Sequence, residues 1–375
     1  MPIQMVDLRG QYLRIKDEVD TAIERVLETT AFIRGPECEA FEAELSSALD
    51  GVGTLGVANG TDALQIAFMA LGIGPGDEVI TPSFTFVATA EAVGLLGATP
   101  VFADIDPTTF TLDPQRVAEL VTERTKAIVP VHLFGQCADM DPILGLACEH
   151  NIAVVEDTAQ AIGATYKGRA AGTLAGFGTL SFFPSKNLGC YGDGGAILSP
   201  IPEWLDQARL ISNHGSKKKY HNEVVGVNSR LDALQAAILR AKLPHLDAFT
   251  AARQLAADRY DERLADLEAV ETPQRASWGS HVFHQYTIRV RGNDAGQRDA
   301  LMEHLNGQGI PSYVYYPVPL HLLPIYRDDP SSCRVGDMTH TLQAANEVLS
   351  LPMHTELTES EQDQIAGAIR AFFQG

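Results

Sequence analysis

Short apolar runs alternate with amphipathic segments between about residues 54 and 200. The runs that look like buried strands lie at residues 54–59, 77–83, 99–105, 126–135, 152–159, 178–183 and 194–199. Helical spacing lies between most of them, for example with apolar residues at Leu64, Ala67, Phe68 and Leu71. Repeated strand–helix units predict right-handed crossovers and an α/β fold with a large, mainly parallel, seven-stranded sheet.

The pattern changes in the second half of the chain. Residues 230–268 predict two helices separated at Pro244, because proline interrupts a helix. The segments that follow predict a strand at 281–290, a helix at 295–309, an irregular strand at 311–319 and a helical C-terminal stretch. We therefore predict a large domain over residues 1–245 and a smaller α+β domain over residues 246–375, on which the N-terminal helix can pack.

Composition and charge exclude several kinds of protein. The 375 residues carry a formal net charge of −20, which disfavours binding to nucleic acid or to an anionic membrane. No apolar stretch reaches the ~18 residues of a membrane span, and the N-terminal stretch lacks the apolar core of a signal peptide. Five widely spaced cysteines favour a reducing, cytoplasmic location. His281 and His284 lack a convincing third ligand, so we predict no metal site.

A lysine follows one of the predicted buried strands. Lys186 comes directly after the strand at 178–183 and precedes a glycine-rich segment, "NLGCYGDGGA". Burial lowers the pKa of a lysine until the neutral amine is available for Schiff-base chemistry. A surface lysine in a loop is the alternative. The glycines argue against it, because they let the backbone pass close to a bulky ligand or to another segment.

Other polar residues lie at the ends of predicted strands or just beyond them. Gly60 and Thr61 begin a helix, where free N–H groups can bind a phosphate, although an ordinary helix cap is the commoner use of such residues. Ser181 could reach the same phosphate. Asp157 either caps a turn or meets a cation in the cleft, and Gln160 follows it three residues later.

Residues near two further helix starts leave alternatives open. Phe84 or Phe86 could stack on a flat ring, but aromatic residues more often belong to the core. Asn228 and Arg230 either cap the helix that follows or reach into a neighbouring cleft. Taken together, a lysine, an acid, a phosphate cup and an aromatic face are what a pyridoxal phosphate site requires. Because ligands bind beyond the carboxyl ends of parallel strands, we predict such a site at that edge.

Longer motifs point the same way. They include "ANGTDAL", "GPGDEVITPSFTFVATA", "VVEDTAQAIGATYKGR", "SFFPSKNLGCYGDGGA", "GVNSRLDALQAAIL" and "YYPVPLH". On these motifs, which follow one another along nearly the whole chain, the sequence resembles the DegT/DnrJ/EryC1/StrS family of sugar aminotransferases. The resemblance implies an aspartate-aminotransferase-like fold (fold type I) with pyridoxal 5'-phosphate as the cofactor.

The resemblance also implies a role for each candidate residue. Lys186 would bind the cofactor covalently and move a proton between cofactor and substrate carbons. Asp157 would pair with the pyridine nitrogen, Gln160 would lie near the ring, and Phe86 would stack on it. The residues implied to hold the phosphate are Gly60, Thr61, Ser181 and, from a second subunit, Asn228. The contribution of Asn228 implies a homodimer with shared active sites.

The resemblance implies substrate contacts as well. The residues concerned are Arg230, His214 and Tyr220, all across the subunit interface, and Tyr315, Tyr316 and His321. Many relatives have His-Tyr-Pro in the substrate loop, whereas this chain has Tyr315-Tyr316-Pro317, so Tyr315 would replace a histidine. The lysine run at 217–219 could attract a diphosphate, or it could belong to a solvated loop.

The implied reaction moves an amino group from L-glutamate to a keto group of a nucleotide-linked sugar. The motifs further resemble those of members that act on 3-keto sugars, such as UDP-2-acetamido-3-oxo-glucuronate, in surface-polysaccharide pathways. Sugars with a keto group at C4, and cyclitols, use the same scaffold.

Three alternatives stay open. Sugar dehydratases of this superfamily carry histidine in place of the lysine, so Lys186 disfavours that branch. An aminotransferase acting on a non-sugar ketone is the second alternative. A non-catalytic regulatory or sensory protein is the third, and against it no DNA-binding helix-turn-helix is evident.

Overall fold

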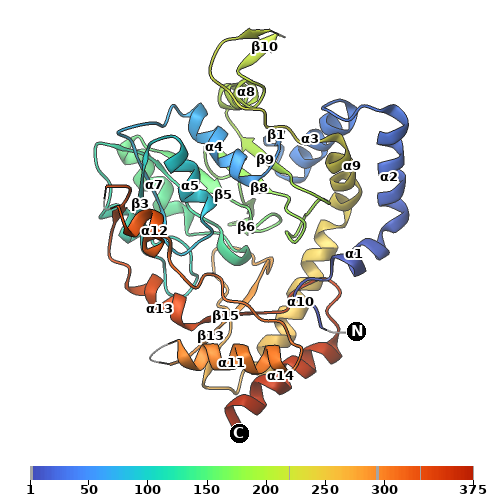
Figure 1. Ribbon diagram of the computed structural model, residues 1–375, viewed down its shortest axis with the longest axis vertical. Coiled ribbons are helices and arrows are strands. Elements are labelled where there is room, and N and C mark those ends of the chain that lie inside the picture. Colours follow the sequence, from blue (N-terminus) through green and yellow to red (C-terminus); the bar gives the residue numbers. More distant parts are fainter. Residues whose placement is uncertain (1–2, 219, 293–294, 330, 375) are drawn as a thin grey trace.

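The computed structural model describes residues 3–218, 220–292, 295–329 and 331–374. Its largest sheet has eight strands in the order β1-β9-β8-β5-β4-β2-β3-β14 (Figure 1). The strands are β1 (Gly53–Val57), β2 (Glu78–Pro82), β3 (Thr99–Ala103), β4 (Thr125–Ile128), β5 (Ala153–Asp157), β8 (Phe177–Ser181), β9 (Gly195–Ser199) and β14 (Arg334–Val335). Pairing is parallel from β8 to β14, whereas β9 is antiparallel to both of its neighbours.

All seven predicted strands form, which confirms the mainly parallel α/β sheet. The eighth strand, β14, is the difference from the prediction. It lies along the edge beside β3. The Arg334 guanidinium holds it there, 2.6 Å from the fully buried carboxylate of Glu78. A strand of two residues has no hydrophobic period, so the sequence pattern does not reveal it.

Helices cover both faces of the sheet, as predicted. One face packs against α4 (Gly60–Ala70), α5 (Ala88–Leu95) and α8 (Pro202–Ile211). The other face packs against α3 (Pro36–Ala48), α6 (Pro114–Ala118), α7 (Met140–His150) and α9 (Ala233–Lys242), and α2 (Lys16–Thr29) packs against α9. Strand β9 shows the alternation: Ile197 joins the α4 and α8 side, while Ala196 and Leu198 join the α3 and α9 side.

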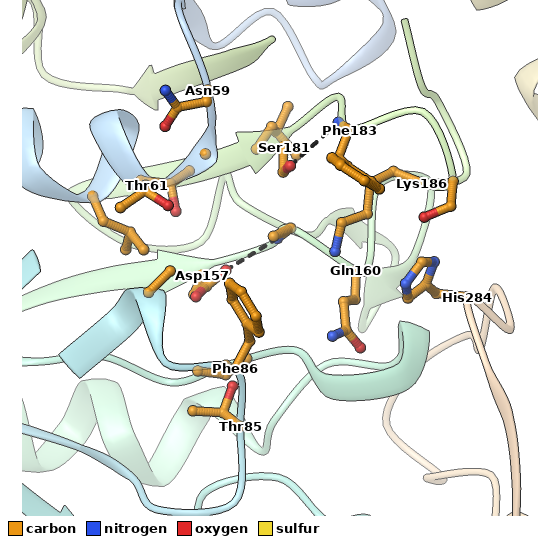
Figure 2. Close-up of a pocket in the computed structure, with 18 of the residues that line it drawn as sticks. Asn59, Thr61, Thr85, Phe86, Asp157, Gln160, Ser181, Phe183, Lys186 and His284 are labelled. Carbon is orange, nitrogen blue, oxygen red and sulfur yellow. Dashed lines mark hydrogen bonds between the residues drawn. The ribbon is translucent and has the colours of Figure 1, made fainter. Parts of the chain in front are cut away.

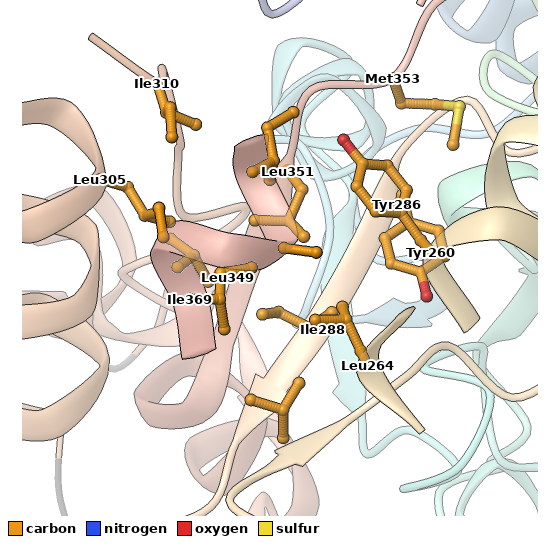
Figure 3. Packing of buried hydrophobic residues seen from close by; sticks show 14 of the residues in the cluster. Tyr260, Leu264, Tyr286, Ile288, Leu305, Ile310, Leu349, Leu351, Met353 and Ile369 are labelled. Atoms are coloured by element: carbon orange, nitrogen blue, oxygen red, sulfur yellow. The ribbon is translucent and has the colours of Figure 1, made fainter. Parts of the chain in front are cut away.

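The C-terminal part builds a second core (Figure 3). A three-stranded antiparallel sheet of β12 (Val270–Glu271), β13 (Tyr286–Val290) and β15 (Val348–Leu351) packs against α10 (Leu246–Leu264), α11 (Gly296–Gly307) and α14 (Glu359–Gln374). The predicted break at Pro244 is confirmed, because a 3-10 turn over Leu243–His245 separates α9 from α10. Residues of the N-terminal stretch reach this region: Ile3 belongs to its core, and Arg14, the last residue of α1 (Leu8–Arg14), lies 2.8 Å from Glu356. The division at residues 245 and 246 stays a prediction.

Two local predictions in this part are wrong. The strand predicted at 281–290 begins only at Tyr286, because the preceding residues turn, with Phe283 at a φ of 45°. The C-terminal stretch is not all helical: β15 lies between α13 (Thr339–Glu347) and α14. The remaining short elements are β6 (Thr165–Tyr166), β7 (Arg169–Ala170), β10 (Ser216–Lys218), β11 (His221–Asn222), α12 (Pro324–Arg327) and the 3-10 turns Leu133–Gly135 and Leu320–Leu322.

Several site candidates meet at the carboxyl ends of the parallel strands. Strands β5 and β8 are parallel neighbours, so Asp157 and Ser181 end at the same edge. The N-terminus of α4 follows β1 at this edge and faces Ser181. Within the described ranges, no helix is long and apolar enough to cross a membrane.

Candidate active site

A cavity of about 830 Å³ lies beyond these strand ends (Figure 2). Nine residues singled out in the sequence line it: Gly60, Thr61, Phe86, Asp157, Gln160, Ser181, Lys186, Tyr315 and Tyr316. They come from segments far apart in the chain, and the parallel sheet brings them together. The structure thus places the predicted phosphate, ring and lysine positions around one space.

Lys186 lies deep in this cavity, on the turn that follows β8. Its backbone N–H donates to the Phe183 carbonyl at 2.8 Å. The turn needs Gly189, since a Cβ there would lie 2.4 Å from the Pro184 carbonyl oxygen. Some of Lys186 is accessible through the cavity, but burial lowers the pKa of its amine to about 8, and the nearby Asp157 carboxylate opposes part of that shift.

Asp157 is the last residue of β5 and is 6% exposed. The Thr89 hydroxyl, from α5, donates to one carboxylate oxygen at 2.7 Å. The Ala159 backbone N–H donates to the other at 3.2 Å. Asp157 therefore caps the turn after β5, as one of the two sequence interpretations expected, and it also lines the cavity, as the other expected.

Aromatic and amide groups form a further part of the lining. Phe84 is fully buried in the core, whereas Phe86 is 56% exposed and lines the cavity, so the two phenylalanines have different roles. The Gln160 carbonyl oxygen accepts from the Phe134 backbone N–H at 2.7 Å. Its amide nitrogen donates to the Tyr316 hydroxyl at 3.2 Å, and burial raises the pKa of that hydroxyl.

The N-terminus of α4 closes another side of the cavity. The Asn59 side chain caps the helix by accepting from the Asp62 N–H at 2.8 Å. A Cβ on Gly60 would lie 2.7 Å from the Ser181 Cβ, so only glycine lets β8 approach the helix start this closely. Backbone N–H groups at a helix N-terminus, with the Thr61 and Ser181 hydroxyls beside them, suit a phosphate group.

Five sequence candidates do not line this cavity: His214, Tyr220, Asn228, Arg230 and His321. The first three belong to or border the segment that carries the β10–β11 hairpin, which projects from the body of the molecule (Figure 1). Arg230 follows this segment and is partly buried. His321 instead shares a hydrogen bond of 2.7 Å with the Ser83 hydroxyl, and burial lowers the pKa of its ring. Of the lysine run, Lys219 lies outside the described residues, and Lys217 and Lys218 are exposed.

The structure also adds residues that the sequence patterns missed. His284 lines the cavity and is 8% exposed, although the sequence considered it only as a metal ligand. Its signal is a polar residue within the apolar stretch "HVFHQY". Thr89 carries no signal, because its bond to Asp157 joins two segments far apart in sequence. No group of residues in the described part of the chain could hold a metal ion.

Comparisons with known proteins agree with this geometry. A family model described as the DegT/DnrJ/EryC1/StrS aminotransferase family matches residues 13–370. The chain belongs to this family. The family assignment confirms the aspartate-aminotransferase-like fold and the aminotransferase class, and aminotransferases of this family depend on pyridoxal phosphate.

Three relatives are informative. A UDP-2-acetamido-2-deoxy-3-oxo-D-glucuronate aminotransferase of Pseudomonas aeruginosa is 47% identical over 98% of this chain and 99% of its own length. A pleiotropic regulatory protein of Geobacillus stearothermophilus is 46% identical over 100% of this chain and 99% of its own. The crystal structure of DesV from S. venezuelae superimposes with a TM-score of 0.95 at 41% identity, covering 100% of this chain and 99% of that one.

Proposed function

We propose that this chain is a pyridoxal-phosphate-dependent aminotransferase that moves an amino group from L-glutamate to a keto group of a nucleotide-linked sugar. The observation that carries the proposal is the Lys186 amine, which lies in the cavity with a lowered pKa and has no hydrogen-bond partner among the described residues. Attack on an aldehyde requires a neutral amine with open space before it, and a pKa of about 8 makes the neutral form far more available near physiological pH than in an ordinary lysine.

The residues present fit the cofactor. Gly60, Thr61 and Ser181 would hold its phosphate at the N-terminus of α4, where a residue larger than glycine at position 60 would collide with Ser181. Phe86 would cover the ring. The Asp157 carboxylate, fixed by Thr89, would face the pyridine nitrogen and keep it protonated.

When bound, pyridoxal phosphate supplies an electron sink, which makes a C–H bond of the attached amino acid acidic. The chain's own residues do the rest. The Lys186 Nζ takes the proton from the donor carbon and returns a proton elsewhere, acting as base and then as acid. Gln160 and Tyr316, joined by their 3.2 Å hydrogen bond, hold one wall of the cavity in place. Reversal of these steps with a keto-sugar delivers the amine to the sugar.

Charge supports a shared site in a homodimer. The charged residues that line the cavity are Asp62, Glu91, Asp157, Asp193 and, as the one cation within the described lining, Lys186. Acidic side chains repel a nucleotide diphosphate, so the cations that attract this part of the substrate must come from elsewhere. In the proposed dimer, Arg230 and the exposed Lys217 and Lys218 of a second copy supply the positive charge. Asn228 of that copy is neutral and adds a polar contact to the phosphate, as the family resemblance implies.

Mixed dimers test the shared site. Lys186→Ala and Asn228→Asp each remove one half of every site in their own homodimers, so each variant alone should be inactive. Random mixing yields heterodimers with one intact site, and about one quarter of the wild-type activity should return. No recovery after mixing, with dimers shown to exchange, would contradict site sharing.

The reaction itself is tested with purified protein and pyridoxal phosphate. L-glutamate should yield one 2-oxoglutarate per subunit, and a UDP-linked 3-keto sugar should then receive the amine. Lys186→Ala should yield neither product. A non-sugar ketone that reacts faster than any nucleotide sugar would favour the second candidate enzyme, and a protein that binds the cofactor without releasing 2-oxoglutarate would favour a regulatory role. Cytoplasmic location stays a prediction.

A further inference from the structure

A second cavity opens beside the first. It measures about 460 Å³ and shares Ser185, His284, Gln285 and Tyr315 with the main cavity, so the two spaces adjoin at these residues. The other residues that line this side cavity are Gln4, Met5, Val6, Pro311, Tyr313 and Met353. Neither the sequence motifs nor the proposed mechanism gives it a role.

The N-terminal segment forms a fixed wall of the side cavity. Ile3 is buried in the C-terminal core, which holds the segment at one end. The Met5 carbonyl accepts from the Met353 backbone N–H at 3.2 Å. Asp7 caps α1 by accepting from the Gly10 N–H at 2.7 Å, which holds the other end. The wall is thus anchored on both sides of residues 4–6.

His284 stands at the junction of the two cavities. It is 8% exposed, and its Nδ1 is buried without a hydrogen-bond partner among the described residues. Burial and the nearby cations Lys186 and Arg253 hold the pKa of the ring well below its usual value, so the imidazole is neutral. A buried polar group without a partner is costly, which points to a ligand that completes its hydrogen bonding.

The side chains that line the side cavity limit the kinds of chemical group that it can bind. Within the described lining, the polar groups are neutral amide, hydroxyl and imidazole groups. The apolar side chains are Met5, Val6, Pro311 and Met353. Because the described residues that line this space include no charged side chain, it does not suit the carboxylates of glutamate or a diphosphate. It suits a neutral amide that carries a methyl group.

We propose that the side cavity binds an N-acetyl group on the sugar ring, with the methyl group against Met5, Val6 and Met353 and the amide toward His284 and Gln285. This assignment rests on the proposed function, since it places the reacting sugar in the main cavity. It makes the side cavity the part of the site that separates N-acetylated sugars from sugars with a hydroxyl group at the same carbon.

Two unreactive probes test it. UDP-N-acetylglucosamine and UDP-glucose differ only by the N-acetyl group, and neither carries a keto group. Titration calorimetry with the cofactor-loaded protein should show UDP-N-acetylglucosamine binding about tenfold more tightly or better, the range for one well-matched small group. The Val6→Trp variant, which fills the side cavity, should reduce this ratio to about twofold or less while leaving the affinity for UDP-glucose nearly unchanged.

Further variants keep the test decisive. Leu255→Trp, an equally bulky change on the 51% exposed side chain of α10, should keep the wild-type ratio. His284→Phe keeps a ring in place but removes the hydrogen bond, and should also reduce the ratio. Equal wild-type affinities, or a ratio retained in both Val6→Trp and His284→Phe, would overturn the assignment and leave the proposed function intact. Binding of neither probe to the wild type would count against a nucleotide sugar altogether.

Discussion

Two buried lysines, 56 positions apart in the printed sequence, both have a lowered pKa, but their amines have different surroundings. Burial lowers the pKa of both Lys186 and Lys242 to about 8. The Lys242 amine donates to the Gly189 carbonyl at 2.5 Å and lies 5.3 Å from the centre of the Tyr191 ring. The Lys186 amine has no such bond to any residue that the structure describes, and it faces a cavity of about 830 Å³.

The comparison teaches what makes a lysine reactive. A lowered pKa is shared by both, so it cannot by itself identify the cofactor lysine. Lys242 is fully buried in α9 and holds the glycine-rich turn, which is a structural task. Lys186 lies on the turn after β8 and lines the same cavity as Asp157 and the N-terminus of α4. Its amine can therefore reach a cofactor bound in that cavity.

The largest effect separates the two lysines by activity. Lys186→Ala should lower the rate of 2-oxoglutarate release from L-glutamate by about 1,000-fold or more, because the proton then has no carrier. Lys242→Met should lower it by about tenfold or less, since that amine does not face the cavity. Single-turnover measurements with cofactor-saturated protein check both. Comparable losses of rate in the two variants would contradict the assignment of a catalytic role to Lys186 and a structural role to Lys242.

The next effect concerns the acid beside Lys186. Asp157→Asn should lower the same rate by about 100-fold, because an amide does not keep the pyridine nitrogen protonated. The variant should also move the pKa of the free Lys186 amine further down, since the Asp157 carboxylate raises it. The pH dependence of cofactor capture by the cofactor-free protein measures that shift. An unchanged rate and an unchanged pH profile would contradict the proposed role of Asp157 beside the cofactor and the Lys186 amine.

A smaller effect tests the approach of β8 to α4. In Gly60→Ala the added Cβ would lie 2.7 Å from the Ser181 Cβ, so unfolding free energy should fall by about 1–3 kcal/mol and the affinity for the cofactor should fall with it. Gly367→Ala is the matched control, because nothing lies within 4 Å of the position of its added Cβ. That variant should gain up to about 1 kcal/mol. Denaturant unfolding of the cofactor-free proteins compares them.

The smallest effect belongs to Lys242 and depends on pH. Its pKa is about 8 in the folded protein and near the ordinary 10.5 in the unfolded chain. The unfolded state therefore binds more protons between these values, and this lysine adds stability as pH rises. Relative to Lys242→Met, the wild type should gain about 2 kcal/mol from about pH 7.5 to about pH 9.5. A difference that does not change with pH would show that the two pKa values are equal.

The sequence predicted best those site residues whose position follows from a single strand and the turn after it. Asp157 ends a strand, and Lys186 and Gly60 follow strands. Because the carboxyl ends of parallel strands lie on the same side of a sheet, the meeting of these residues could be predicted. The fold class followed from the same alternation.

Contacts between segments far apart in the chain could not be predicted from the pattern of apolar and polar residues. The Thr89 bond to Asp157 and the Gln160 bond to Tyr316 join residues 68 and 156 positions apart. His284 was expected on a strand but lies on the turn before β13, which aims it into the cavity. The hairpin residues stay untested for a different reason, since their proposed partners belong to a second copy of the chain.

The most direct test of the central claim is to find which lysine carries the cofactor. Borohydride reduction of the pyridoxal-phosphate-loaded protein fixes the cofactor to its lysine, and peptide mass spectrometry then locates it. The label should lie on Lys186 in the wild type and disappear in Lys186→Ala. A label on Lys242, or on any other lysine in the wild type, would show that the cavity at the strand ends is not the active site.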